Sequence, residues 1–333
     1  MIDLPLVWAL LIALAVLMYV VLDGFDLGIG ILFPFVKGER KRDVMMNSVA
    51  PVWDGNETWL ILGGGGLYAV FPLAYSVLLT ALYAPLIAML LALVFRGVAF
   101  EFRFKDPRHK PLWDAAFAGG SAVATFCQGI VLGAFIQGIE IEGRSYAGSW
   151  FDWLTPFSVF TGLALVLGYA LLGAGWLIMK TEGELQRNVY RMILPLGALV
   201  VLAIGLVSLW TPLLNDEIAA RWFSWPNIAW LWPVPILVAL VAWALVRAVA
   251  ARKEVQPFVL SLTLFLLSYL GLGISLFPNI IPPGVTIWQA AAPDASLGFL
   301  LIGALVLLPI ILGYTGYAYW VFRGKVDPSQ GYH

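Results

Sequence analysis

The segment VLDGFDLGIG, residues 21–30, places two carboxylates, Asp23 and Asp26, inside an apolar stretch that runs from residue 4 to residue 35. An ionised carboxylate in hydrocarbon is strongly unfavourable unless it is paired, hydrated or protonated. A spacing of three residues puts both side chains on one face of a helix. The pair is either held by a buried arginine, for which Arg96 is the candidate, or handles protons, and the sequence leaves both interpretations open.

A second polar group lies in NSVAPVWDGNETWL, residues 47–60. Asp54 followed by Glu57 fits an acidic N-cap with a carboxylate three residues later, as in a capping box, which is a strong structural interpretation. Together with Asp23 and Asp26 these residues would gather four carboxylates near one side of a bilayer, as a proton entrance requires. The candidate site residues are therefore Asp54, Asp23, Asp26, Glu57 and Arg96.

The elements that must position these residues are membrane helices. The chain has 333 residues, of which 61% are hydrophobic and 12% charged, and its mean hydropathy of +0.90 excludes a soluble domain. A helix needs about 20 apolar residues to cross a bilayer, and stretches of about this length lack the alternation of barrel strands. We predict an all-α integral membrane protein, a single transmembrane domain over residues 1–333, with nine spans at 4–35, 57–73, 76–99, 112–138, 155–179, 189–211, 227–250, 256–277 and 295–322.

Charge predicts the orientation of these spans. All but Arg144 and Arg221 of the 19 lysines and arginines follow the first, third, fifth, seventh or ninth stretch. Because loops on the cytoplasmic side carry the excess of Lys and Arg, we expect the N-terminus outside and the C-terminus inside.

Histidine usage argues against a redox centre in this chain. The only histidines are His109, between charged residues of an inner loop, and His333. Haem and copper centres in membranes usually rely on histidine ligands, so we expect no cofactor and no metal bound by this chain alone. The single cysteine, Cys127, allows no intrachain disulfide, and no basic aromatic surface suggests a nucleic acid.

Three further segments carry weaker predictions. Gly63–Gly66 predicts close packing against a neighbouring helix, because a phosphate-binding loop would need a lysine. Gln128, Gln137 and Glu140 suggest a polar seam along the fourth stretch. The Pro-rich segment 275–293 cannot form a continuous helix and predicts a packed reentrant turn or a surface loop.

Five blocks of the sequence carry a resemblance to a known family. They are LDGFDLGIG, NSVAPVWDGNETWL, VFRGVAFEFR, SLFPNIIPPGVTIW and LPIILGYTGYAYWVFRGKV. In this order, over essentially the whole chain, they resemble subunit II of the cytochrome bd-type quinol oxidases. The FPNIIPP and YTGYAYWVFRGKV segments most resemble the cyanide-insensitive bacterial branch.

The resemblance implies an architecture and partners. It implies nine helices arranged as two four-helix bundles plus one peripheral helix, in the bacterial cytoplasmic (inner) membrane, with a periplasmic N-terminus. The expected partner is subunit I, a separate chain that holds two haem b and one haem d or b, and the complex would use ubiquinol and O2. A small accessory transmembrane subunit is compatible with the resemblance. Some members hold a quinone in subunit II as a structural lipid, and the sequence does not decide whether this chain does.

The resemblance also implies a role for the acids. Quinol oxidation outside releases protons there, whereas reduction of O2 to water takes protons from inside, so a proton motive force arises without pumping. By motif position, cytoplasmic proton uptake falls on Asp54, with Asp23, Asp26 and Arg96 as supporting polar groups. Two alternatives stay open: a proton-coupled secondary transporter, which would also contain broken helices and buried acids, and a purely structural subunit whose acids only pair with Arg96.

Overall fold

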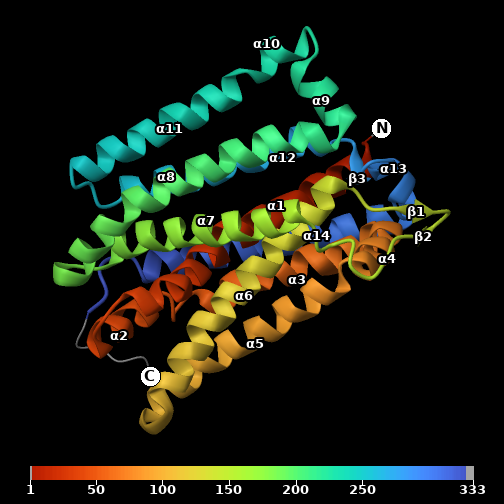
Figure 1. Cartoon of the computed structure of the whole chain (residues 1–333). Coiled ribbons are helices and arrows are strands. Elements are labelled where there is room, and N and C mark those ends of the chain that lie inside the picture. Colours follow the sequence, from red (N-terminus) through yellow and green to blue (C-terminus); the bar gives the residue numbers. More distant parts are fainter. Residues whose placement is uncertain (1, 328–333) are drawn as a thin grey trace.

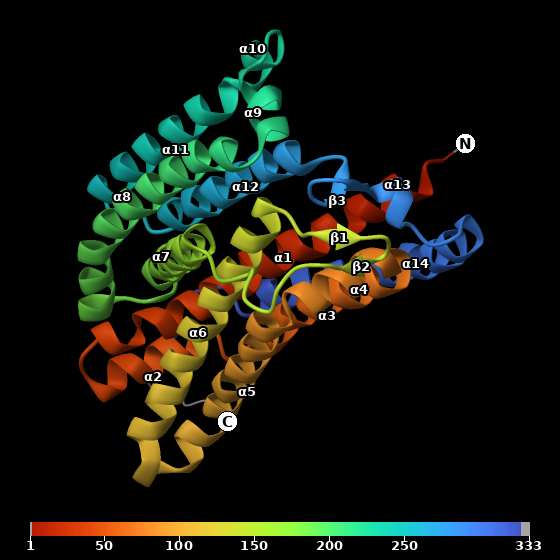
Figure 2. The same ribbon diagram turned by 45° about the vertical axis from the view of Figure 1, so that its right-hand side comes forward.

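The computed structural model describes residues 2–327 and is almost entirely helical (Figures 1 and 2). Helix α1, Leu4–Leu32, begins where the Asp3 side chain accepts a hydrogen bond from the Leu6 amide at 3.0 Å. It runs as one α-helix through its glycines and continues into the short 3-10 helix η1, Phe33–Phe35. Helix α2, Glu39–Asn47, follows after a turn at Gly38.

The next helices are α3, Trp53–Val70, α4, Pro72–Ala81, and α5, Tyr83–Lys105. The predicted span at 76–99 is wrong at its start, because the helical run is interrupted at Leu82. Pro85 explains the interruption, since its ring would clash with the carbonyl of Ala81 in a continuous helix. The short 3-10 helix η2, Pro107–His109, then leads into α6, Lys110–Gln137.

The second half of the described chain contains five longer helices and three shorter ones, of which α13 is described with the hairpins below. Helices α7, Pro156–Lys180, and α8, Gly183–Leu214, are followed by the short α9, Asp216–Phe223, and α10, Asn227–Leu231. Helices α11, Pro233–Ala250, and α12, Gln256–Leu276, precede the final α14, Asp294–Val321. The Thr155 hydroxyl caps α7 by accepting from the Ser158 amide at 3.0 Å.

Two small hairpins lie at the end of the molecule where α1 begins (Figure 1). Strands β1, Ile141–Glu142, and β2, Ser145–Tyr146, pair antiparallel after α6. The Pro-rich segment forms β3, Asn279–Ile281, β4, Val285–Thr286, and the one-turn helix α13, Ile287–Ala290. The Ile139 amide donates to the Pro282 carbonyl at 2.9 Å, so the Pro-rich segment is packed against the chain leaving α6.

Eight helical segments in residues 2–327 are long and apolar enough to cross a membrane. The predicted span at 57–73 corresponds to α3, which does not meet this criterion. Its first turn holds Asp54, Asn56 and Glu57, and these polar residues lower the hydropathy of an 18-residue helix. In the described part of the chain, the number of helices apolar enough to span a membrane is therefore one fewer than the nine predicted from the sequence.

Helix α1 lies in the middle of the fold and packs against α3, α6 and α7. The approach to α7 is closest at Gly28, where an added Cβ would lie 1.8 Å from the Tyr169 carbonyl oxygen. In α3, Gly66 faces Ile12 of α1, and a Cβ added at Gly66 would lie 3.3 Å from the Ile12 side chain. A Cβ added at Gly64 or Gly65 would meet no atom within 4 Å. The expected close packing thus involves part of the glycine run.

Helix α14 packs weakly but is fixed at its C-terminal end. Its buried residue is Leu297, close to its start. Just after the helix, the Lys180 ammonium group donates to the Phe322 carbonyl at 2.6 Å, and the Val326 amide donates to the Lys180 carbonyl at 2.9 Å. The Lys325 ammonium group donates to the Thr181 carbonyl at 3.0 Å. We refer to these contacts of Lys180, Thr181, Phe322, Lys325 and Val326 as the C-terminal clamp.

Candidate functional site

A buried ion cluster joins α1, α3 and α5. Arg96 places Nη1 3.0 Å from Oδ1 of Asp23 and Nη2 3.9 Å from Oδ2 of Asp26. The same Nη1 lies 3.7 Å from Oε2 of Glu57. The side chains of Arg96, Asp23 and Asp26 are fully buried, whereas that of Glu57 is 26% exposed. We call Arg96, Asp23, Asp26 and Glu57 the ion centre.

Local sequence explains how the ion centre forms. Asp23 and Asp26 are three residues apart, so α1 presents both carboxylates on one face. Gly24 lies between them, and an added Cβ there would meet the Tyr169 ring at 2.9 Å, so α7 covers this part of α1 closely. Arg96 comes from the C-terminal half of α5, and its guanidinium carbon lies 5.8 Å from the Trp53 ring centroid and 5.7 Å from that of Phe100. These two rings, stacked at 4.7 Å, cover the guanidinium.

The charges of the ion centre do not balance. One guanidinium offsets one of three carboxylates, which leaves an excess of buried negative charge that bound protons can neutralise. Glu57 is the member of the ion centre that reaches solvent. The predicted contacts of Asp23 and Asp26 with Arg96 are found in the structure.

Asp54 lies at the surface and outside the ion centre. Its side chain is exposed in the first turn of α3. The capping-box prediction is wrong, since the N-cap residue is Val52 and no side chain caps the helix. The preceding turns supply carbonyl acceptors instead, because the Trp53 amide donates to the Val49 carbonyl at 3.0 Å and the Asn56 amide to the Val52 carbonyl at 3.0 Å. Asp54 thus makes no capping hydrogen bond at the start of α3.

Asn56 connects the ion centre to the far end of the sequence. Its Nδ2 donates to Oδ2 of Asp26 at 2.7 Å and approaches the Leu22 carbonyl oxygen at 3.4 Å. Its Oδ1 accepts from the Tyr319 hydroxyl at 2.9 Å. Sequence reasoning did not find Tyr319, because it is one of several tyrosines in the YTGYAYW segment and its partner lies 263 residues earlier.

A second amide bridge extends from the ion centre toward the middle of α6. Gln128 donates from Nε2 to the Tyr19 hydroxyl at 2.6 Å and accepts on Oε1 from the Tyr169 hydroxyl at 3.0 Å. Tyr19 lies four residues before Asp23, on the same face of α1. Gln137, by contrast, accepts from Thr155 beside the cap of α7, and Glu140 is exposed. The predicted polar seam along α6 therefore reduces to Gln128, which joins α1 to α7.

One end of the bundle carries a separate set of ion pairs. Arg103 contacts Asp43 and Asp114, each at 2.5 Å, and Arg42 contacts Asp114 at 2.9 Å. Arg42 and Arg103 also face the Phe33 ring at 5.4 and 5.3 Å. These contacts tie α2, α5 and α6 together at one end of the bundle. Arg42 and Arg103, which follow the first and third predicted spans, are therefore paired with acids. None of these contacts involves a residue of the ion centre.

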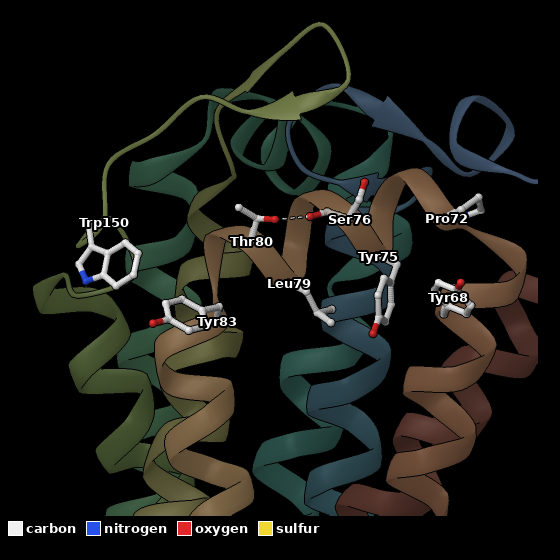
Figure 3. Close-up of a pocket in the computed structure, with 8 residues that line it drawn as sticks. All are labelled: Tyr68, Pro72, Tyr75, Ser76, Leu79, Thr80, Tyr83 and Trp150. Carbon is white, nitrogen blue, oxygen red and sulfur yellow. Dashed lines mark hydrogen bonds between the residues drawn. The ribbon is translucent and has the colours of Figure 1, made fainter.

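Two grooves lie away from the ion centre. Figure 3 shows one of about 590 Å³ along α4, lined by Tyr68, Tyr75, Tyr83 and Trp150 among others. The other, of about 550 Å³, is an apolar groove between α1, α3 and α14, with Gly65 and Gly66 in its wall. No carboxylate lines either groove, so neither extends the ion centre.

Histidine, a common haem ligand, is scarce among the described residues. Their single histidine, His109, lies in η2 and has Nδ1 2.8 Å from Oδ2 of Asp106. This hydrogen bond holds the pKa of Asp106 below its usual value. No group of three or more His, Cys, Asp or Glu side chains within residues 2–327 is arranged to hold a metal ion. His333 lies outside the described residues.

Comparisons with known proteins agree on one family. The family described as cytochrome bd terminal oxidase subunit II matches residues 4–322. The cytochrome bd-I ubiquinol oxidase subunit 2 of Escherichia coli strain K12 is 31% identical, over 97% of this chain and 95% of its own. The cytochrome bd ubiquinol oxidase subunit 2 of Bacillus subtilis is 30% identical, over 97% of both chains. A chain of the bd oxidase structure from Geobacillus thermodenitrificans superposes with a TM-score of 0.78 at 16% identity, covering 96% of this chain and 99% of that chain.

Proposed function

The chain belongs to the cytochrome bd terminal oxidase subunit II family and is a subunit of a quinol oxidase complex, and we propose that within this complex it takes up protons from the cytoplasm. The observation that carries the proposal is the ion centre. Three carboxylates share one guanidinium, and one of them, Glu57, is partly exposed. A structural ion pair needs one carboxylate per guanidinium, so a structural role does not account for the two additional acids, whereas proton uptake does.

The proton route begins at the surface and runs inward. Asp54 is exposed one helical turn before Glu57, Glu57 contacts Arg96, and Arg96 contacts Asp23 and Asp26. Asp54 would collect protons at the inner surface, and Glu57 would pass them to the buried acids. Arg96 keeps negative charge in the centre tolerable between transfers.

The haems of the complex belong to subunit I in this proposal. The expected set is two haem b and one haem d or b, and residues 2–327 contain one histidine, His109. Oxidation of ubiquinol on the outer side and reduction of O2 with protons from the inner side would generate a proton motive force without pumping. A small accessory transmembrane subunit is compatible with this arrangement. A structural quinone would fit the apolar groove between α1, α3 and α14.

The proposed architecture has nine membrane helices in a single transmembrane domain over residues 1–333. Helices α1, α3, α5 and α6 would form one four-helix bundle and α7, α8, α11 and α12 the other, with α14 peripheral. Packing supports this division, because α1 contacts α3 and α6, α5 contacts α6, and α7, α8, α11 and α12 contact one another in a ring. The bundles meet where α7 packs on α1 and α6.

The proposal is tested by neutralising the two acids nearest the surface in the assembled complex. Asp54→Asn and Glu57→Gln keep the side-chain shapes and remove the negative charge. We expect both variants to retain near-normal haem content and to slow quinol-driven oxygen consumption severely, while Asp54→Glu keeps part of the rate. Haem spectra and oxygen-electrode rates are measured on the same membranes.

Glu101→Gln is the matched control, because Glu101 is an exposed acid near the same end of α5 that pairs with Lys105 at 2.8 Å. It should leave the rate unchanged. Normal turnover in both Asp54→Asn and Glu57→Gln would reduce the ion centre to a structural ion pair. A transporter would be indicated instead if the chain purified from native membranes colourless and without a partner.

A further inference from the structure

The orientation of the Asn56 amide is fixed by its neighbours. An Asn side chain offers two N–H donors on one side and a carbonyl acceptor on the other, and its orientation follows from the hydrogen bonds it makes. Asp26 Oδ2 and the Leu22 carbonyl oxygen are both acceptors, so Nδ2 must face them. Oδ1 then needs a donor, and the Tyr319 hydroxyl supplies it at 2.9 Å.

The opposite orientation of the amide would disturb the ion centre. It would turn Oδ1 toward the Asp26 carboxylate, so that two acceptors met without a proton between them. Asn56 is 1% exposed and Asp26 is 0% exposed, so water does not relieve such a contact cheaply. Only a protonated Asp26, which can donate, would match the reversed amide.

We propose that Tyr319 is a positioning residue of the ion centre, holding the Asn56 amide in place so that its N–H group stays directed at Asp26 and supports Asp26 as a proton acceptor. The hydroxyl acts through Asn56 and does not touch Asp26. By donating to Oδ1 it also polarises the amide, which strengthens the N–H donor that Asp26 receives. This inference rests on the proposed proton uptake, because it assigns Asp26 the role of accepting a proton.

Helix α14 carries this contact near its C-terminal end. The helix is largely exposed, and Tyr319 lies near its C-terminal end, three residues before Phe322 of the C-terminal clamp. The clamp fixes the height of this end against α7. Tyr319 also packs against the rings of Phe25 and Trp176, at centroid distances of 6.4 and 6.1 Å. The hydroxyl is therefore held in place independently of its hydrogen bond to Asn56.

The other groups around Asp26 are unchanged by a substitution at Tyr319. The charged and polar groups that face Asp26 are Arg96 from α5, Asn56 and Glu57 from α3, and Asp23 from its own helix. Two further titratable groups, Tyr19 of α1 and Tyr169 of α7, lie on the Asp23 side of the centre. Removal of the Tyr319 hydroxyl takes away the donor to Asn56 Oδ1 and so weakens the hydrogen bond that Asn56 gives to Asp26.

The test is Tyr319→Phe in the assembled complex. If Asp26 must be ionised to accept a proton, the acid limb of the pH dependence of quinol-driven oxygen consumption moves to higher pH. Because the lost hydrogen bond reaches Asp26 only through Asn56, the expected shift is a fraction of that of a direct hydrogen bond, up to about 0.5 pH unit. Tyr317→Phe is the control, since Tyr317 lies two residues away on the same helix and is 62% exposed. It should leave the pH profile unchanged.

A second readout does not depend on turnover. The infrared band of protonated carboxyl groups is titrated in the purified complex, and Tyr319→Phe should shift part of this titration to higher pH. The shifted component should be missing in Asp26→Asn. Unchanged infrared titration and unchanged pH profile in Tyr319→Phe would overturn the proposal. A shifted infrared titration with an unchanged pH profile would support positioning by Tyr319 and contradict proton uptake through Asp26.

A second variant, Asn56→Ala, tests the proposal if the Tyr319→Phe complex does not assemble. If Tyr319→Phe does not accumulate haem, Asn56→Ala removes the same bridge from the side of α3. It must move the infrared titration in the same direction as expected for Tyr319→Phe. An infrared titration like that of the unsubstituted complex would overturn the proposal.

Discussion

At the scale of single residues, Arg96 is the side chain on which the ion centre depends. A guanidinium without solvent exposure is tolerable because Asp23 lies 3.0 Å away and two further carboxylates lie within 4 Å. Removing one partner of a buried ion pair typically destabilises a protein by about 3 to 5 kcal/mol, because the remaining charge is left without compensation. Here the loss of Arg96 would leave several carboxylates in that state.

Arg96→Leu should therefore lower the amount of assembled complex and its melting temperature. Arg96→Lys should be intermediate, because an ammonium group is a single point of charge and cannot face two carboxylates with a planar fork. Addition of Asp23→Asn and Asp26→Asn to Arg96→Leu should restore part of the stability without restoring turnover. Thermal melting followed by haem absorbance measures these differences. Equal melting temperatures for Arg96→Leu and the unsubstituted complex would contradict the assigned role.

Residue-scale predictions from sequence succeeded where the signal was local. The pairing of Asp23 and Asp26 with an arginine followed from their spacing in an apolar stretch, and Arg96 was the expected partner. The cap assigned to Asp54 was wrong because carbonyl groups from the turns after α2 satisfy the first amides of α3. Tyr319 had no local signal, since its contact with Asn56 depends on the packing of the whole bundle.

At the scale of elements, the contact between α1 and α7 depends on two glycines. An added Cβ at Gly28 would lie 1.8 Å from the Tyr169 carbonyl oxygen, and one at Gly173 would lie 2.5 Å from the carbonyl carbon of Gly28. Neither neighbour can move away as a flexible side chain would, because both are backbone atoms. The two helices would have to separate to admit a methyl group.

Gly28→Ala should accordingly lower the melting temperature of the complex, with a loss of about 1 to 3 kcal/mol as in other overpacked cores. It should also slow turnover, because the separation displaces the α1 turn that carries Asp26. Gly64→Ala is the control, since an added Cβ there meets no atom within 4 Å. Equal melting temperatures for the two variants would contradict the close-packing assignment.

Elements were predictable from sequence wherever one apolar run made one helix. Helices α6, α7, α12 and α14 lie within a few residues of the predicted spans. The predicted span at 76–99 was wrong at its start because apolar residues continue across the break between α4 and α5. Pro85, and not a polar residue, sets this break in the helix. Apolarity alone reports that a segment can enter a membrane, whereas the end of a helix depends on backbone hydrogen bonding.

At the scale of the whole molecule, the basic residues gather at one end of the bundle. Ion pairs there join segments that are distant in sequence, such as Lys41 with Glu184 at 2.5 Å and Lys325 with Glu254 at 2.8 Å. The hairpin of β1 and β2 lies at the opposite end, near the start of α1 (Figure 1). The uneven distribution of Lys and Arg along the sequence thus corresponds to a basic end of the bundle and an opposite end that is poor in basic residues.

Reporter fusions test the orientation of this body in the membrane. Fusions after Asp43, Lys110 and Arg252 should score cytoplasmic, and a fusion in the loop at 140–152 should score periplasmic, because the Lys and Arg excess stays on the inner side. A truncated fusion reports the insertion of the preceding helices, so each position is compared with an in-frame insertion into the full chain. A periplasmic signal after Lys110 would falsify the proposed topology.

The contact between Asn56 and Tyr319 sets an order of events during synthesis. Chains are made from the N-terminus, and earlier segments fold before later ones exist. Helices α1, α3 and α5 can bring Arg96 to its acids while α14 has not yet been translated. The Asn56 side-chain carbonyl has no Tyr319 donor until this tyrosine, which lies 263 residues later in the chain, has been translated. A nascent chain therefore carries an ion centre whose last hydrogen bond reports that α14 has been translated and has docked.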